Sequence, residues 1–297
     1  MTSATDAAPE IDPVTKDIDS ATIARLEERA LFVRLETLRL IGIAKVGHYA
    51  SAFSAAEIFA TLYYDTMRLK RGEPQWTDRD RFLMGKGHAA VGLFPILADW
   101  DFFPKEVLDG YTRLGNPLGD HPDMRNVPGI DFSSGSIGHA LSGGLGVALG
   151  TRMQGKDINA YVMLGDGEMQ EGQVWEAALS AAHHRARNLI AIIDRNGFQL
   201  DGRVDDIMGI EPLAAKWRAF NWDVHEVNGH DVAALAALLR RVKADTAREM
   251  PVCIIARTIK GKGVSYMETE PGWHLGYLAP EDEVRAIAEL KRGGAIR

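Results

Sequence analysis

Two short apolar runs separated by one helical segment constrain the fold of this chain most strongly. The runs are "NAYVML" (159–164) and "NLIAIID" (188–194), and the segment between them, "QEGQVWEAALSAAHHRAR" (170–187), has apolar residues at helical spacing. Apolar runs of this length are typical of strands that are buried on both faces of a parallel sheet. The three segments therefore predict a βαβ unit.

The same alternation of strand and helix continues through the chain. Further strands are predicted at "WDVHEV" (222–227) and "PVCIIART" (251–258), with the helical segment "DVAALAALLRRVKAD" (231–245) between them. A long first helix is predicted over about 21–45, and a short strand at "RFLMG" (81–85). Parallel strands joined through helices predict an α/β fold, a doubly wound and mostly parallel sheet with helices on both faces.

The domain organisation follows from where apolar residues occur. Residues 1–19 hold few residues able to anchor them and are expected to be a flexible N-terminal segment, whereas residues 20–297 are expected to form one domain. The stretch "SAAE" is typical of a capping box, which predicts that Ser54 and Glu57 start a helix. The glycine-rich stretch "SSGSIGHALSGGLGVALG" (133–150) predicts a turn and a helix that can pack closely on a partner or ligand; a flexible loop is the alternative.

Composition excludes several classes of protein. A net charge of -7 argues against nucleic acid as a partner, because phosphate binding favours a basic surface. The first residues lack the apolar core of a signal peptide, and the chain has no run of about 18 apolar residues, so we expect a cytoplasmic protein that does not enter a membrane. The single cysteine, Cys253, excludes a disulfide framework and is expected to be buried and inert.

Polar residues follow the two strands of the βαβ unit. Gly165, Asp166 and Gly167 follow the first strand and Asn196 follows the second. Since ligands of such sheets bind beyond the carboxyl ends of the strands, the Asp166 carboxylate and the Asn196 amide oxygen can converge on one cation. With a backbone carbonyl they form a set of hard oxygen ligands suited to Mg²⁺ or Ca²⁺, with positions left for a diphosphate. A Gly-Asp-Gly sequence alone also occurs in ordinary hairpin turns.

These residues belong to a longer pattern. Gly-Asp-Gly, 28 residues and then Asn196 resembles the thiamine diphosphate signature of transketolases. Further stretches match transketolase motifs in order: "GHYASAFSAAEIFATLYYD", "RFLMGKGHAA", "GDHPD", "SGSIGHALSGGLGVALG" and "ARTIKGKGVSYME". The resemblance implies that Asp166, Asn196 and the Phe198 carbonyl hold the metal. It also implies that residues around the cofactor are Gly135, Ile137, Gly165, Gly167 and Glu168.

Four histidines lie in loops beside or near glycines: His48, His88, His121 and His274. Each alone is more often a structural or surface residue, but imidazole exchanges protons near neutral pH, as chemistry on a sugar requires. By the resemblance, they line the channel to the thiazolium ring and bind the hydroxyls of the donor sugar. The local motif of His274 differs most from the family pattern. His183 and His184 are interpreted as surface or packing residues.

Several positions depart from the family pattern or carry no role in it. His139 and Ala140 stand where the family commonly has Gln and Gly, which could alter packing behind the cofactor or the pairing surface. Gly85 replaces a frequent serine. Lys260 and Lys262 are interpreted as solvated lysines with at most anion contacts.

The resemblance also implies a partner. In transketolases the glutamate that activates the cofactor comes from a second, pyrimidine-binding domain, and no such domain is found before Arg297. We therefore expect an α2β2 heterotetramer with a separate C-terminal, pyrimidine-binding subunit. Glu171 matches a family residue that faces the paired subunit; it is equally suited to the first turn of a helix.

The function implied is transfer of a two-carbon ketol unit from a ketose donor to an aldose acceptor, on sugars or sugar phosphates. The α subunit of a 2-oxoacid dehydrogenase shares the Gly-Asp-Gly signature and the division into subunits, but not the series of histidines. A non-catalytic cofactor-binding module is a third possibility. A dinucleotide-binding domain is disfavoured, because no G-x-G-x-x-G follows the first strand.

Overall fold

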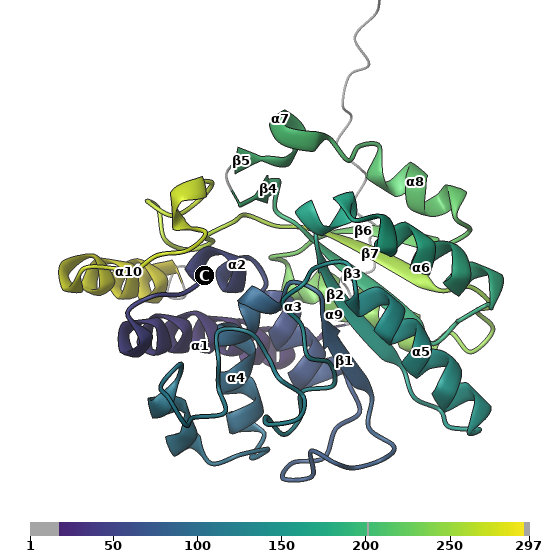
Figure 1. The fold of residues 1–297 in the computed structure, drawn as a ribbon, viewed down its shortest axis with the longest axis horizontal. Coiled ribbons are helices and arrows are strands. Elements are labelled where there is room, and N and C mark those ends of the chain that lie inside the picture. Colours follow the sequence, from purple (N-terminus) through teal and green to yellow (C-terminus); the bar gives the residue numbers. More distant parts are fainter. Residues whose placement is uncertain (1–17, 201, 294–297) are drawn as a thin grey trace, which may run out of the picture.

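A five-stranded parallel sheet forms the centre of the molecule (Figure 1). The computed structural model describes residues 18–200 and 202–293, so the expected flexibility of residues 1–17 lies outside the described residues. The strands, in their order across the sheet, are β1 (Arg81–Met84), β2 (Ala160–Gly165), β3 (Leu189–Arg195), β7 (Val252–Arg257) and β6 (Asp223–Asn228). Each neighbouring pair is parallel, which confirms the predicted strands and fold class.

Alternate residues of the strands face two separate cores. Val162 of β2 pairs in register with Ala191 of β3, which pairs with Cys253 of β7, and these three side chains belong to one core. Their neighbours Tyr161 and Ile190 belong to the other. Because both of their faces are covered, the central strands β2, β3 and β7 are apolar along most of their length, whereas the edge strand β6 carries Asp223, His225 and Glu226. Cys253 is fully buried, as predicted.

Helices cover both faces of the sheet (Figure 1). On one face lie α5 (Ala140–Met153), α6 (Gly172–His183) and α8 (Leu213–Ala219). The other face is covered by α1 (Ser20–Ala44), α2 (Tyr49–Ser54), α3 (Ala56–Thr61), α4 (Ala90–Asp99), α9 (Val232–Ala244) and α10 (Pro280–Gly293). Shorter elements are η2 (Leu62–Thr66), η3 (Gly87–Ala89), η4 (Lys105–Gly110), η5 (Gly167–Gln170), β4 (Phe198–Gln199), β5 (Gly202–Arg203), α7 (Val204–Met208) and η6 (Pro271–Trp273).

The first helix begins and ends at clear signals. The Asp19 carboxylate accepts a hydrogen bond from the Thr22 amide at 2.8 Å and so caps the N-terminus of α1. Lys45 has a left-handed backbone conformation, with φ of 62°, and ends the helix. The predicted helix over about 21–45 is confirmed.

The predicted capping box at 54–57 is wrong. Ala55 lies at the N-terminus of α3 and no side chain caps it. The Ser54 hydroxyl donates instead to Asp194, at 2.6 Å, and the Glu57 carboxylate binds Arg34 and His230. Both side chains are buried, and buried polar groups take partners from other elements when these lie close.

The glycines of α5 lie on different sides of the helix. A Cβ atom at Gly144 would overlap the side chain of Val162 in β2, so this glycine allows α5 to pack closely on the sheet. A Cβ atom at Gly146 would meet no described atom within 4 Å. The stretch is thus a packed helix and not a flexible loop. None of the helices within 18–200 and 202–293 has the length and apolar character needed to cross a membrane.

Candidate functional site

A cleft of about 430 Å³ opens at the carboxyl edge of the sheet. Four neighbouring strands contribute to it, because Lys86 follows β1, Asp166 follows β2, Asn196 follows β3 and Lys260 follows β7. Ligands of open parallel sheets bind at this edge. The order of the strands therefore brings together segments that are far apart in the sequence.

Most of the residues singled out in the sequence line this cleft. They are His88, Gly135, Ile137, Gly165, Asp166, Gly167, Glu168, Glu171, Asn196, Phe198 and His274. The cleft is also lined by residues that the sequence did not single out for it: Ser51, Lys86, Gln170, Gln199, Leu200 and Lys260. The geometry gathers the predicted residues, while their individual roles stay predictions.

Asp166 is a buried carboxylate, with 1% of its surface exposed. One oxygen accepts from the amide of Gly167 at 2.9 Å, and the other accepts from the amide of Gly197 at 2.6 Å and from the Arg195 guanidinium at 3.0 Å. Burial and the nearby Asp194 raise the pKa of Asp166 to about 6, although Arg195 opposes this shift. A further cation at this carboxylate would favour its ionised form.

The predicted metal ligands lie around the same turn. The Asn196 side-chain oxygen accepts from the amide of Phe198 at 3.0 Å, which folds the residues after β3 back toward Asp166. Among the described residues no cluster of three or more His, Cys, Asp or Glu could hold a metal. The predicted set is of another kind, since it combines one carboxylate with an amide oxygen and a backbone carbonyl.

Glu168 ties the cleft to the start of α5. Its carboxylate accepts from the amides of Gly138 at 2.7 Å and Gly165 at 3.0 Å, and burial nevertheless raises its pKa to about 7. A Cβ atom at Gly85 would overlap this carboxylate. The absence of a side chain at position 85 thus leaves room for Glu168 in its present place.

The structure corrects the prediction made for Lys260. It was expected to be solvated, but it is 1% exposed, and its Nζ has no hydrogen-bond partner among the described residues. Burial and the neighbouring Lys86 lower its pKa to about 8. Lys262 is half-buried and pairs with Glu268 at 3.6 Å. Its ammonium lies 5.6 Å from the centre of the Phe198 ring, but a buried ammonium group without a hydrogen-bond partner is costly, so the Lys260 side chain is suited to an anionic ligand in the cleft.

The sequence contained a feature that could have identified Lys260 as a residue of the site, namely its position after a predicted strand. It lies between strand β7 and Gly261, at the same edge of the sheet as Asp166 and Asn196. A second residue not singled out is Asp194, which is fully buried and pairs with Lys86 while accepting from Ser54 and Thr258. An aspartate within the apolar run "NLIAIID" was its signal.

The four loop histidines meet beside the cleft. The ring of His48 lies 5.1 Å from that of His88, 5.3 Å from that of His274 and 6.2 Å from that of His121, measured between ring centroids. His88 and His274 are 5.1 Å apart. His48 also contacts Asp120, with 3.3 Å between its Nδ1 and a carboxylate oxygen.

Two of these histidines are held neutral. Burial, followed by the charge of Lys86, lowers the pKa of His88 well below its usual value. Burial and the charge of Lys260 lower the pKa of His274 to about 3. At neutral pH each ring therefore has one nitrogen that donates and one that accepts a hydrogen bond.

Other predicted positions lie at the edge of the site or away from it. His139 is exposed and does not line the cleft, so it does not pack behind a ligand there, while Ala140 is the buried first residue of α5. Glu171 is exposed where α6 begins. His183 and His184 are exposed, as predicted.

Comparison with known proteins points to one family. Residues 27–292 match the family described as transketolase, thiamine diphosphate binding domain. The chain is 39% identical over 270 residues to the 6-deoxy-6-sulfo-D-fructose transketolase subunit of Clostridium sp. (strain MSTE9), covering 91% of this chain and 98% of that relative. It is 38% identical over 257 residues to an apulose-4-phosphate transketolase subunit of Phocaeicola vulgatus, covering 86% and 90%.

Solved structures agree with the sequence comparison. The transketolase from Leishmania mexicana superposes with a TM-score of 0.83 at 27% sequence identity. The match covers 91% of this chain and 41% of that one, so the chain spans about two fifths of the length of that transketolase.

Proposed function

The chain belongs to the transketolase family through its thiamine diphosphate binding domain, and from this premise we propose that it is the N-terminal subunit of a two-component transketolase. The observation that carries the proposal is the cleft lined by Asp166, Asn196 and Lys260, whose ammonium has no hydrogen-bond partner among the described residues. Two relatives of similar length are named as transketolase subunits, which supports the division into two chains.

The cleft suits thiamine diphosphate and a divalent ion. Oxygens of Asp166, Asn196 and the Phe198 carbonyl would hold Mg²⁺ or Ca²⁺. The Lys260 ammonium, which is buried without a partner, would bind the diphosphate. Five further residues that line the cleft would surround the cofactor: Gly135, Ile137, Gly165, Gly167 and Glu168. When bound, thiamine diphosphate supplies a nucleophilic carbon and an electron sink, which allow a carbon–carbon bond beside a ketose carbonyl to break.

The histidines would act on the sugar. His88 and His274 line the cleft and are neutral, so they can donate to one hydroxyl and accept from another without bringing charge. His48 and His121 belong to the same group of rings, although neither of them lines the cleft itself. We infer that these four residues bind the hydroxyl groups of the donor and assist proton transfer.

The reaction would need a second chain. We propose that a separate C-terminal, pyrimidine-binding subunit assembles with this one as α2β2 and contributes the glutamate which activates the cofactor. Glu171 and His139 are exposed near the cleft and the start of α5, in position to face such a partner. The substrates proposed are a ketose donor and an aldose acceptor; the two relatives are named for different sugars. The cytoplasmic location stays a prediction.

Reconstitution tests the proposal. The chain would be purified together with the product of the neighbouring gene and supplied with thiamine diphosphate, Mg²⁺ and a panel of ketoses and aldoses. Transfer of a two-carbon unit is expected. Decarboxylation of pyruvate instead would indicate a 2-oxoacid dehydrogenase, and turnover of no ketose would indicate a non-catalytic module.

A substitution in the cleft separates binding from folding. Asp166→Ala should abolish Mg²⁺-dependent retention of thiamine diphosphate while circular dichroism stays unchanged. Asp65→Ala is the matched control, because this carboxylate is also buried and pairs with Arg240 in a part of the chain that does not line the cleft. Equal retention by the Asp166 variant and the wild-type protein would contradict the proposed site.

A further inference from the structure

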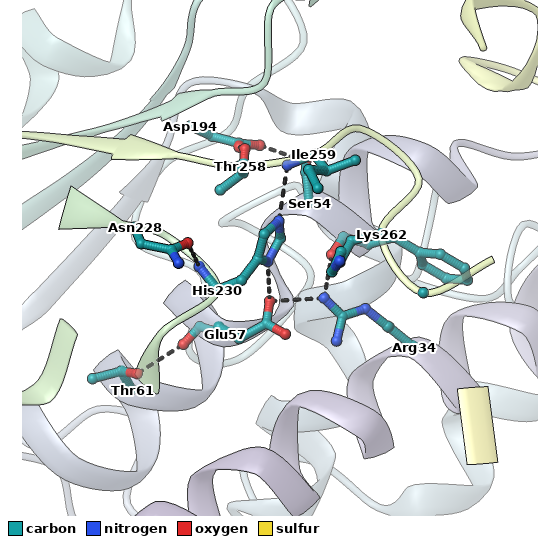
Figure 2. A network of polar contacts seen from close by, with 12 residues as sticks. Arg34, Ser54, Glu57, Thr61, Asp194, Asn228, His230, Thr258, Ile259 and Lys262 are labelled. Carbon is teal, nitrogen blue, oxygen red and sulfur yellow. Dashed lines mark hydrogen bonds and ion pairs between the residues drawn. The ribbon is translucent and has the colours of Figure 1, made fainter. Parts of the chain in front are cut away.

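A buried polar network links the helices on one face of the sheet to the turn that carries Lys260 (Figure 2). Its centre is His230, whose side chain is 11% exposed and lies between Glu57 and the backbone of Ile259. Nδ1 of His230 is 2.9 Å from the Glu57 carboxylate, and Nε2 is 2.8 Å from the amide nitrogen of Ile259. Glu57 lies within a stretch that matches a transketolase motif, but neither the resemblance nor the cleft gives a role to Glu57 or His230.

The network fixes the protonation of the histidine. A backbone N–H can only donate, so Nε2 of His230 accepts from Ile259 and carries no proton. Nδ1 therefore carries the proton and donates a hydrogen bond to the Glu57 carboxylate. Because Arg34 also binds Glu57, at 2.7 Å, one negative and one positive charge balance with the imidazole neutral. Burial alone would raise the pKa of Glu57, but Arg34 and His230 lower it to about 2.

The position of His230 depends on the turn between β6 and α9. The Asn228 side-chain oxygen accepts from the amide of His230 at 3.0 Å, and the amide of Gly229 donates to the Arg257 carbonyl at 2.7 Å. A Cβ atom at Gly229 would overlap Thr258. The missing side chain thus lets this turn approach the end of β7, where His230 reaches Ile259.

Ile259 immediately precedes Lys260. The Lys260 carbonyl accepts from the amide of Thr269 at 3.0 Å, and the amide of Gly261 donates to the Ala50 carbonyl at 3.2 Å. The backbone of the turn is therefore held on both sides of Lys260. Its side-chain ammonium has no hydrogen-bond partner of its own among the described residues. Apart from the Phe198 ring, whose centre is 5.6 Å from the ammonium, the backbone contacts of the turn are what hold Lys260 at the cleft.

We propose that Glu57 and His230 are positioning residues for Lys260. Glu57 orients the imidazole and holds its proton on Nδ1, and His230 then binds the Ile259 amide and fixes the turn that places the ammonium in the cleft. This inference rests on the proposed function, because it takes Lys260 as the contact for the cofactor diphosphate.

A set of variants of the full-length chain tests the proposal. In His230→Asn the side chain is too short to reach both Glu57 and Ile259, so hydrogen exchange of the segment 258–263 should become about tenfold faster. The Gln side chain in His230→Gln can accept from Ile259 and should restore much of the protection. His225→Asn is the matched control, since His225 pairs with Asp223 in β6, 3.1 Å away, outside the cleft.

Cofactor affinity gives the second measurement, by calorimetry with thiamine diphosphate and Mg²⁺ on the chain reconstituted with its partner. His230→Asn and Glu57→Gln should each weaken binding by about tenfold. In a Lys260→Met background, the His230→Asn change should weaken binding by less than about twofold, because residues that act through one group are not additive. General loss of stability would weaken binding equally in both backgrounds.

Two results would overturn the inference. One is unchanged exchange of 258–263 in His230→Asn, and the other is an affinity loss that persists in the Lys260→Met background. A wild-type complex that binds no thiamine diphosphate would instead refute the proposed function. Hydrogen exchange would still decide whether His230 holds the turn. If Glu57→Gln fails to fold, the loss in His230→Asn and its restoration in His230→Gln still test the inference.

Discussion

Two glycines of α5 provide a direct test of how this helix packs on the sheet. Gly144 lies against β2, where an added Cβ would overlap Val162 and lie 3.2 Å from Leu189, whereas an added Cβ at Gly146 would meet no described atom within 4 Å. Both positions lie inside the same helix. Replacing either glycine by alanine therefore brings the same gain in helix propensity, and the two variants differ only in packing.

The expected magnitudes follow from that difference. Gly146→Ala should stabilise the chain by about 0.5–1 kcal/mol, the usual gain when alanine replaces glycine within a helix. Gly144→Ala should gain the same amount and lose about 1–3 kcal/mol, because inserting a methyl group into a packed core forces neighbouring side chains to shift. The variants should therefore differ by about 1–3 kcal/mol in free energy of unfolding.

Urea unfolding of the isolated chain, followed by circular dichroism and tryptophan fluorescence, measures this difference. A higher midpoint for Gly146→Ala and a lower one for Gly144→Ala, with equal slopes, is the expected pattern. If both midpoints rise by the same amount, α5 does not pack against β2 as closely as described and the reasoning fails.

Two further predictions concern ionisable groups. The pKa of Glu57 falls from 4.5 in the unfolded chain to about 2 in the folded protein. The ionised carboxylate therefore contributes about 3 kcal/mol to the free energy of unfolding above pH 4.5. This contribution is lost as the pH falls through about 2. The free energy of unfolding should therefore decline more steeply between pH 5 and 3 in the wild-type chain than in Glu57→Gln, and parallel profiles would contradict the network. His274 has a pKa near 3, so its ring should show no titration above pH 5 by NMR in the isolated chain. Its pKa should rise in Lys260→Met, because the charge of Lys260 helps to lower it. An inflection near pH 6.5 in the wild-type chain would argue against the burial of His274.

The sequence predicted the strands well because strands buried on both faces leave a plain pattern. No charged residue interrupts the segment that forms β2, or the segment that forms β3 before Asp194. The helix between them has apolar residues at regular helical spacing. The sequence could not predict that β7 lies between β3 and β6, because the order of strands depends on long-range pairing.

From topology alone, the candidate site was predictable only where it lies at the end of a strand, whereas Gly135, Ile137 and His274 were predicted from the family resemblance. Asp166 and Asn196 follow predicted strands, so their approach could be inferred from topology alone. Lys260 is buried where the chain folds back and the Thr269 amide donates to the Lys260 carbonyl. No local sequence pattern reveals this long-range contact. Ser54 and Glu57 match a local capping rule, but tertiary partners outweighed it, as they commonly outweigh local preference.

The site is formed by residues at the strand ends and by residues of the long connection between η4 and α5. Residues 111–139, all of them within the described part of the chain, form no helix or strand, yet they bring His121, Gly135 and Ile137 to the site. Tyr111 and Leu118 of this connection are buried in the core, and the Asp131 carboxylate accepts from the Phe82 amide of β1, so only its exposed positions tolerate change as loops commonly do. Variation at those positions would reshape the rim of the cleft and leave the turns at the strand ends as they are.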